Sequence, residues 1–95
     1  MSKTSLTVMS QPSCVQCTAT YRALDKKGLP YESIDMTVDA EAHALAKSFG
    51  YMQAPVVVVR DEAGTVLEHW SGMRPDKISA YAQSLATVEP ELLAA

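Results

Sequence analysis

The chain has 95 residues, 47% of them hydrophobic, with a formal net charge of −3 and an isoelectric point near 5.2. This length fits one domain, the hydrophobic content is typical of a globular chain, and the acidic balance argues against nucleic acid as a partner. No charged and apolar leader opens the chain, and its longest aliphatic run, Val56 to Val59, is far too short to cross a bilayer, so we expect a monomeric, cytoplasmic protein without membrane attachment.

The first half of the chain predicts a strand, a helix, a second strand and a second helix. Alternating residues predict a strand over 5–9, and residues 11–13 break it, with Ser13 as a candidate cap for a helix over 15–27. Gly28 suits the left-handed position that ends a helix, and a strand over 31–36 follows. Asp39 is expected to cap the second helix, Gly50 to close it, and its apolar stripe is Ala42, Leu45, Ala46 and Phe49.

The second half predicts a hairpin and a third helix. Pro55 opens a strand over 56–59, whose valine run predicts burial on both faces. Residues 61–64 have turn chemistry, and residues 65–70 form the return strand. The third helix begins at Pro75 and stops at Glu89 and Pro90, which divides the chain into a domain over 1–89 and a tail over 90–95.

The predicted order is β-α-β-α-β-β-α. A right-handed crossover makes the first two strands parallel, and the hairpin adds antiparallel strands. We therefore predict an α/β protein with the thioredoxin fold, in which three helices flank a mixed four-stranded sheet. The carboxyl end of the first strand is where open sheets of this kind place their chemistry.

Cys14 and Cys17 are the only cysteines, and they follow the first strand in a C-x-x-C spacing. A disulfide across so short a loop stabilises a fold by only about 2 kcal/mol, against about 3 kcal/mol for a fifteen-residue loop. Such a bond suits electron transfer better than structural cross-linking. Unpaired N–H groups at the helix start would lower the pKa of the Cys14 thiol, and Cys17, one turn deeper, would be the resolving thiol.

The sequence allows two other interpretations of the cysteines. They can be inert buried thiols, or they can form half of a zinc site. Zinc needs four ligands, and the spacing of His43 and His69 does not fit a zinc finger. The position at a predicted strand-to-helix junction favours redox chemistry.

Three stretches, residues 14–28, 50–56 and 69–76, together resemble the NrdH-redoxins, which are glutaredoxin-like proteins. The most specific stretch is the Trp-Ser-Gly-Met-Arg-Pro-Asp run that begins at Trp70. The resemblance covers about residues 6–78. It implies that this protein donates electrons to the large subunit of class Ib ribonucleotide reductase. It also implies that thioredoxin reductase reduces this protein. No cofactor is then bound by the chain, because flavin and NADPH belong to that reductase.

The resemblance also implies roles for particular residues. Cys14 is the attacking thiol, Cys17 the resolving thiol, and Pro55 a cis-proline beside them. The backbone of Gln53 and Ala54 can pair with an incoming chain as an added strand. The expected partner-binding residues are Val15, Gln16, Gln53, Ala54, Pro55, Trp70, Ser71, Gly72, Met73 and Arg74.

The sequence departs from the family at two places and leaves several roles open. Met73 stands where the family usually has Phe, and the hairpin over 60–68 is longer than is common. Trp70 can be a core residue, Arg74 a salt-bridged surface residue, and Pro55 simply the start of a strand. Two other functions compete: a glutathione-coupled glutaredoxin or general disulfide reductase, and a redox-switched regulator of the kind that binds RNA polymerase.

Overall fold

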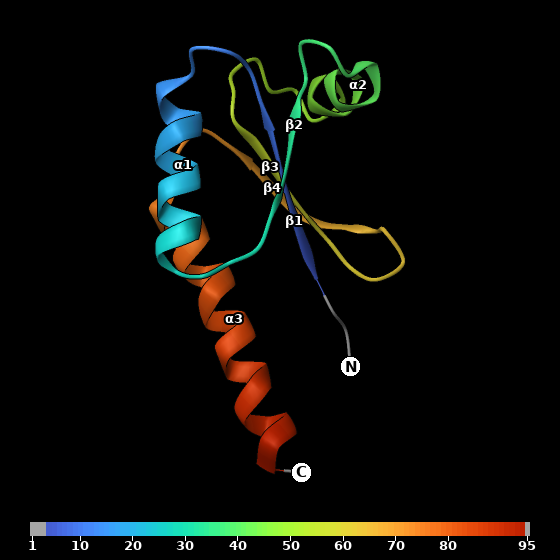
Figure 1. Cartoon of the computed structure of the whole chain (residues 1–95). Coiled ribbons are helices and arrows are strands. Elements are labelled where there is room, and N and C mark those ends of the chain that lie inside the picture. Colours follow the sequence, from blue (N-terminus) through green and yellow to red (C-terminus); the bar gives the residue numbers. More distant parts are fainter. Residues whose placement is uncertain (1–3, 95) are drawn as a thin grey trace.

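The computed structural model describes residues 4–94, with side chains described for residues 4–85. It confirms the predicted order of elements (Figure 1). These are β1 (Ser5–Ser10), α1 (Val15–Lys26), β2 (Glu32–Asp35), α2 (Ala40–Ser48), β3 (Val56–Arg60), β4 (Val66–Ser71) and α3 (Pro75–Ala94). In the part of the chain that the structure describes, no helix is both long and apolar enough for a membrane crossing.

The four strands form one mixed sheet in the order β2-β1-β3-β4. β1 pairs with β2 in parallel and with β3 in antiparallel orientation, and β3 pairs with β4 as a hairpin. The hairpin turn follows the predicted chemistry, because one Asp61 carboxylate oxygen accepts hydrogen bonds from the N–H groups of Ala63 and Thr65, each at 2.9 Å. The thioredoxin fold expected from the sequence is therefore confirmed.

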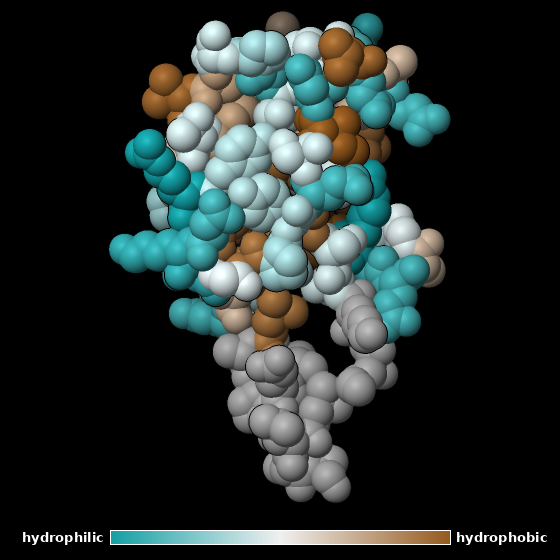
Figure 2. All heavy atoms as spheres, viewed as in Figure 1, coloured by the Kyte–Doolittle hydropathy of each residue, from teal (hydrophilic) through white to brown (hydrophobic). Residues whose placement is uncertain are grey.

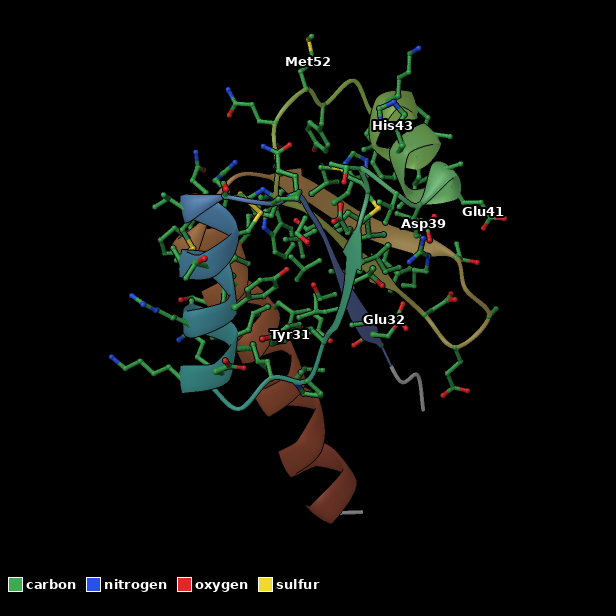
Figure 3. The ribbon with its side chains drawn as sticks, turned by 45° about the horizontal axis from the view of Figure 1, so that its top comes forward. Tyr31, Glu32, Asp39, Glu41, His43 and Met52 are labelled. Carbon is green, nitrogen blue, oxygen red and sulfur yellow. A yellow bond between two sulfur atoms is a disulfide. The ribbon has the colours of Figure 1, made fainter. Side chains whose placement is uncertain are left out.

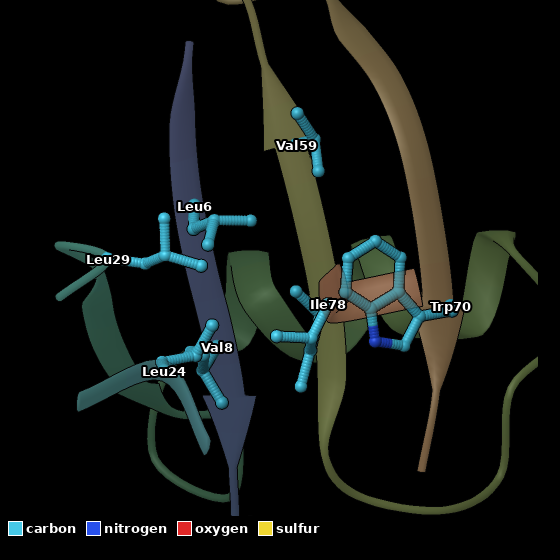
Figure 4. Close-up of a cluster of buried hydrophobic side chains, with 8 residues drawn as sticks. Leu6, Val8, Leu24, Leu29, Val59, Trp70 and Ile78 are labelled. Carbon is cyan, nitrogen blue, oxygen red and sulfur yellow. The ribbon is translucent and has the colours of Figure 1, made fainter. Parts of the chain in front are cut away.

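The valine run of β3 is buried on both faces of the sheet, as predicted, because successive side chains of a strand point to opposite sides. Val57 and Val59 join one core cluster, which Figure 4 shows in close-up, and Val56 and Val58 join another. The first cluster lies under α1 and α3 and also contains Leu6, Val8, Leu24, Leu29, Trp70 and Ile78. The second lies under α2 and also contains Met9, Ala42 and Ala46.

The ends of the first two helices also follow the sequence. Lys27 caps α1 at its carboxyl end, and Gly28 takes a left-handed φ of 68°. The Asp39 carboxylate accepts a hydrogen bond from the N–H of Ala42 at 2.9 Å, which satisfies one of the free donors at the start of α2. Gly50, with φ of 82°, follows the end of α2.

The predicted end of the third helix is wrong. α3 continues to Ala94 and passes through Pro90. An interior proline removes one hydrogen bond and crowds the carbonyl four residues before it, but its φ near −65° is a helical value, so a helix is disfavoured at such a position and not excluded. The division of the chain at residue 89 into a domain and a tail stays a prediction.

Candidate active site around the two cysteines

The two cysteines are joined by a disulfide at the start of α1. β1 ends at Ser10, and the chain turns through Ser13, which has a left-handed φ of 56°. A non-glycine residue seldom takes this conformation, and it directs the chain into the helix. Cys14 then adopts the extended conformation of an N-cap residue. The sequence suggests Ser13 as the cap of this helix. The structure shows instead that Cys14 holds the cap position.

The sulfur of Cys14 takes part in the cap itself. It accepts a hydrogen bond from the N–H of Cys17 at 3.1 Å. The carbonyl of Cys14 accepts from the N–H of Thr18 at 3.2 Å, and so begins the helical hydrogen-bond pattern. The amide end of α1, which carries positive partial charge, therefore faces the Cys14 sulfur.

The exposure of the two cysteines differs in the expected direction. Cys17 is 2% exposed, whereas Cys14 is half-buried. An attacking sulfur must reach a second protein, and a resolving sulfur must reach only its neighbour. The arrangement therefore allows Cys14 to meet a partner disulfide while Cys17 stays behind it.

Pro55 and the loop before it are connected to the site by hydrogen bonds to the last residue of β4 and the residue that follows it. The Ala54–Pro55 peptide bond is cis, which agrees with the expectation from the family resemblance. The Pro55 carbonyl accepts a hydrogen bond from the N–H of Gly72 at 2.9 Å. The Gln53 carbonyl accepts from the Ser71 hydroxyl at 3.0 Å. The loop before β3 is thus fastened to residues 71–72, and Pro55 is both the residue before a strand and part of this junction.

The four residues Ser71, Gly72, Met73 and Arg74, here called the β4–α3 segment, also contact the cysteine helix. The Met73 N–H donates to Oε1 of Gln16, which lies between the two cysteines, at 3.0 Å. The Met73 side chain packs on the α1–α3 core, with its sulfur 3.7 Å from the Thr20 hydroxyl. The structure therefore brings together residues from three separate stretches of the sequence.

Other residues predicted for partner binding are placed differently. Trp70 is 2% exposed and belongs to the core, the alternative that the sequence had left open, and no partner for its Nε1 is found within the described residues. Ala54 is also buried, at 6% exposure. Val15 is 84% exposed between the cysteines. Figure 2 shows hydrophobic surface at the upper end of the molecule, where α1 begins and α2 lies.

Arg74 is an exposed, salt-bridged residue. Its Nε and Nη2 atoms donate to the two carboxylate oxygens of Asp76 at 3.1 and 2.8 Å. These bonds are the main reason that the pKa of the Asp76 carboxyl lies below its usual value. The pair stands at the first turn of α3, where a carboxylate is also favoured by the helix dipole.

A groove of about 970 Å³ was not predicted. It lies between the residues that lead from β2 into α2 and the loop from α2 to β3. Gln11 and Gln53 line it, and so do Val38 and Met52, which are 83% and 97% exposed. In Figure 3, Met52 points away from the protein, from the loop beside α2. The sequence signal for this groove was the presence of two large apolar residues in loops, but their shared position depends on the fold.

No metal-binding cluster of three or more His, Cys, Asp or Glu side chains occurs in the part of the chain that was described. The two histidines belong to other elements than the cysteines, His43 to α2 and His69 to β4. His69 stacks on Phe49, with ring centroids 3.8 Å apart, and its Nδ1 lies 2.9 Å from the Tyr51 hydroxyl. His43 lies on α2 and lines the groove.

Comparison with known proteins places this geometry in context. The glutaredoxin family matches residues 6–63. The glutaredoxin-like protein NrdH of Salmonella typhimurium is 35% identical over 75 residues, which cover 79% of this chain and 85% of that protein. The structure of NrdH-redoxin from Escherichia coli, described as having a thioredoxin-like activity profile, superposes with a TM-score of 0.68 at 35% identity and covers 79% of this chain and 91% of that one. A Malassezia sympodialis thioredoxin superposes with a TM-score of 0.66 at 17% identity, over 86% of this chain and 74% of its own, which is a likeness of fold.

Proposed function

Because this chain belongs to the glutaredoxin family, as one of its NrdH glutaredoxin-like members, we propose that it carries electrons from thioredoxin reductase to the large subunit of a class Ib ribonucleotide reductase. The activity of this family is thiol–disulfide exchange at a C-x-x-C pair, which in this chain is Cys14 and Cys17. The observation that carries the finer part is the likeness to NrdH-redoxin of Escherichia coli, whose activity profile is described as thioredoxin-like.

The exchange proceeds in two displacements. In the reduced protein, the Cys14 thiolate attacks one sulfur of the client disulfide, a mixed disulfide forms, and the other client sulfur leaves as a thiolate. Cys17 then loses its proton and attacks the Cys14 sulfur. The second client thiolate leaves, and the Cys14–Cys17 disulfide is restored. Two electrons pass to the client, and two protons complete its thiols.

The geometry supports Cys14 as the first nucleophile. Its sulfur faces the Cys17 N–H at 3.1 Å, at the positive end of α1. In the reduced protein this donor stabilises a thiolate more than a neutral thiol, so it lowers the pKa of the Cys14 thiol. Cys17, at 2% exposure, has no comparable access to a partner before the mixed disulfide forms.

The client chain is proposed to dock across residues 14–17, the loop before Pro55 and the β4–α3 segment. The backbone of Gln53 and Ala54 is proposed to pair with the client as an added strand, and the Gln53 carbonyl, which accepts from the Ser71 hydroxyl, fixes this loop to the end of β4. Val15, at 84% exposure, offers apolar contact beside the attacking sulfur. Trp70 does not contact the client in this arrangement. Its side chain lies in the core and anchors the end of β4, from which the β4–α3 segment continues.

The redox step needs no cofactor on this chain, because the electrons are held by the two sulfurs. Flavin and NADPH would belong to the reductase that recharges the disulfide. The reduced form must persist for the cycle to run, and the cytoplasm provides the reducing conditions under which it does. We place the protein there.

A coupled assay separates the proposed electron source from glutathione. The oxidised protein is mixed with NADPH and either thioredoxin reductase or glutathione with glutathione reductase, and NADPH consumption is followed with insulin as the final acceptor. We expect turnover with thioredoxin reductase and little with glutathione. The reverse preference would assign a glutathione-coupled glutaredoxin. An absence of turnover with both, in protein that oxidises and reduces normally, would favour a redox-switched regulator.

Cysteine variants in the same assay test the order of attack. Cys14→Ser removes the nucleophile and should abolish turnover. Cys17→Ser should stop after the first displacement and accumulate a mixed disulfide with insulin, visible as a covalent adduct in non-reducing gels and by mass spectrometry. An adduct that forms in Cys14→Ser instead would reverse the two roles.

A further inference from the structure

Gln16 lies between the two cysteines, yet its side chain is bonded to a distant part of the fold. We propose that Gln16 is a positioning residue for thiol–disulfide exchange: its carboxamide fixes the β4–α3 segment against the cysteine helix, so that the surface that receives the client is assembled before the client arrives. The proposal depends on exchange at Cys14 and Cys17, and it does not depend on which protein is the client.

The first observation is a hydrogen bond between residues 57 positions apart. The Met73 N–H donates to Oε1 of Gln16 at 3.0 Å. Gln16 is the second residue of α1, so its backbone is held by the same helix start that holds Cys17. Any displacement of the β4–α3 segment relative to the cysteines must therefore stretch or break this bond.

The second observation is how closely the neighbouring backbone passes the same carboxamide oxygen. A Cβ atom placed on Gly72 would lie 3.0 Å from Oε1 of Gln16, and Gly72 has a φ of 83°. A side chain at position 72 would therefore crowd the Gln16 carboxamide. The oxygen that accepts from the Met73 N–H thus also lies close to Gly72.

The third observation is how the rest of the segment is held. Ser71 and Gly72 are tied to the opposite side, to the carbonyls of Gln53 and Pro55, at 3.0 and 2.9 Å. On the α1 side, the Thr20 hydroxyl lies 3.7 Å from the Met73 sulfur, which is a weak contact because thioether sulfur is a poor acceptor. If the Gln16 acceptor is lost, the segment stays attached to the cis-proline loop, and the Met73 side chain still packs on the α1–α3 core, but the Met73 backbone loses its hydrogen bond to the cysteine helix.

This arrangement predicts a specific kinetic signature. The described contacts of the Gln16 carboxamide are with the β4–α3 segment, and the Cys14 sulfur takes its hydrogen bond from the Cys17 N–H instead. Loss of the carboxamide should therefore weaken docking of a protein disulfide more than it slows the chemical step. Since docking is lost by failure to preorganise one segment, the expected weakening is about three- to tenfold, the range for one hydrogen bond.

Two substitutions of similar size separate the hydrogen bond from the bulk of the side chain. Gln16→Glu keeps an oxygen that can accept from Met73, and Gln16→Met keeps the length without an acceptor. Reduced protein is mixed with a concentration series of insulin in single-turnover experiments, at an ionic strength that screens the added charge of Gln16→Glu. We expect Gln16→Met to raise the half-saturating insulin concentration by about three- to tenfold, with the limiting rate changed less, and Gln16→Glu to remain near the original protein. Arg22→Gln, on the exposed side of α1, is the matched control.

Amide hydrogen exchange supplies a readout that does not depend on activity. In Gln16→Met the Met73 amide should exchange faster, while the Gly72 amide, which donates to Pro55, should change little. An unchanged Met73 amide in Gln16→Met, or a loss in the limiting rate and in the reaction with hydroxyethyl disulfide that equals the loss in docking, would overturn the positioning role and leave the exchange activity itself intact as a conclusion.

Discussion

The two faces of the sheet carry hydrophobic cores of different extent. On the α1–α3 face, two helices cover a cluster that contains Trp70, Leu24 and Ile78, each at 2% exposure or less. On the α2 face, the nine-residue helix α2 contributes only two buried residues, Ala42 and Ala46, at 6% and 5% exposure. The 970 Å³ groove lies beside α2, whose Ala46 and Lys47 help to line it. Figure 1 shows the two arrangements on opposite sides of the sheet.

This difference places the redox groups on the more deeply packed face, the α1–α3 face, which is called the deep face below. The elements that hold the redox groups, α1 and the β4–α3 segment, are packed on it through Leu24 and Met73. The groove lies on the α2 face, and Gln11 and Gln53, which line it, belong to the loops before α1 and before β3. A reaction between sulfurs needs fixed geometry, and the larger core supports the elements that supply it.

The largest expected effect compares two neighbouring valines. Val57 and Val58 are both fully buried on β3, but Val57 faces the α1–α3 core and Val58 the α2 core. We expect Val57→Ala to lower the free energy of unfolding by about 2–3 kcal/mol and Val58→Ala by about 1–2 kcal/mol, because the short helix can settle into the space while two long helices cannot. Urea unfolding of the oxidised protein, followed by fluorescence of the single tryptophan, Trp70, measures both. Equal costs would mean that the two faces are equally rigid.

A smaller effect is expected at the start of α2. Asp39→Ala removes the acceptor for the Ala42 N–H and should lower stability by about 1 kcal/mol. Because α2 is anchored by few large side chains, the loss should appear first as faster amide exchange within Ala40–Ser48, with α1 unaffected. Asp39→Asn, which keeps a capping oxygen, is the control. Faster exchange in both helices would show instead that the two faces unfold together.

The sequence predicted features that depend on neighbouring residues. The Asp39 cap, the left-handed Gly28 and the doubly buried valine run each follow from a few adjacent positions, and all three are confirmed. The sequence predicts the cap of α1 at Ser13 and not at Cys14, because both side chains can accept a hydrogen bond and the left-handed φ of Ser13 has no sequence signature. It also predicts a helix end at Pro90, although the φ that a proline ring imposes is compatible with a helix.

Features that depend on distant residues were out of reach. The bond between Gln16 and Met73 joins residues 57 positions apart, so its existence requires the register of β3 with β4 and the packing of α1. The groove likewise forms only where three loops meet. The family resemblance pointed to the residues of the β4–α3 segment, but it did not indicate that Gln16 contacts them.

The smallest expected effect concerns the first turn of α3, on the deep face. Arg74 lowers the pKa of the Asp76 carboxyl through two hydrogen bonds, so this carboxyl is more acidic in the folded protein than in the unfolded chain. A group of this kind stabilises the fold above its unfolded pKa, and that stabilisation is lost as the pH falls through its folded pKa. Both side chains are exposed, so the effect is small and screened by salt.

The test compares the original protein with Asp76→Asn in urea unfolding from neutral pH to strong acid. The original protein should be slightly more stable above the ordinary aspartate pKa of about 4, and the two should converge only at lower pH, as the pH falls through the lowered pKa of the folded carboxyl. Arg74→Gln should remove the same difference, because the carboxyl then loses its partner. A gap between the proteins that is constant across the whole pH range would mean that Asp76 stabilises α3 by its shape or by helix propensity rather than by its charge, and the start of the deep-face helix would then depend on packing alone.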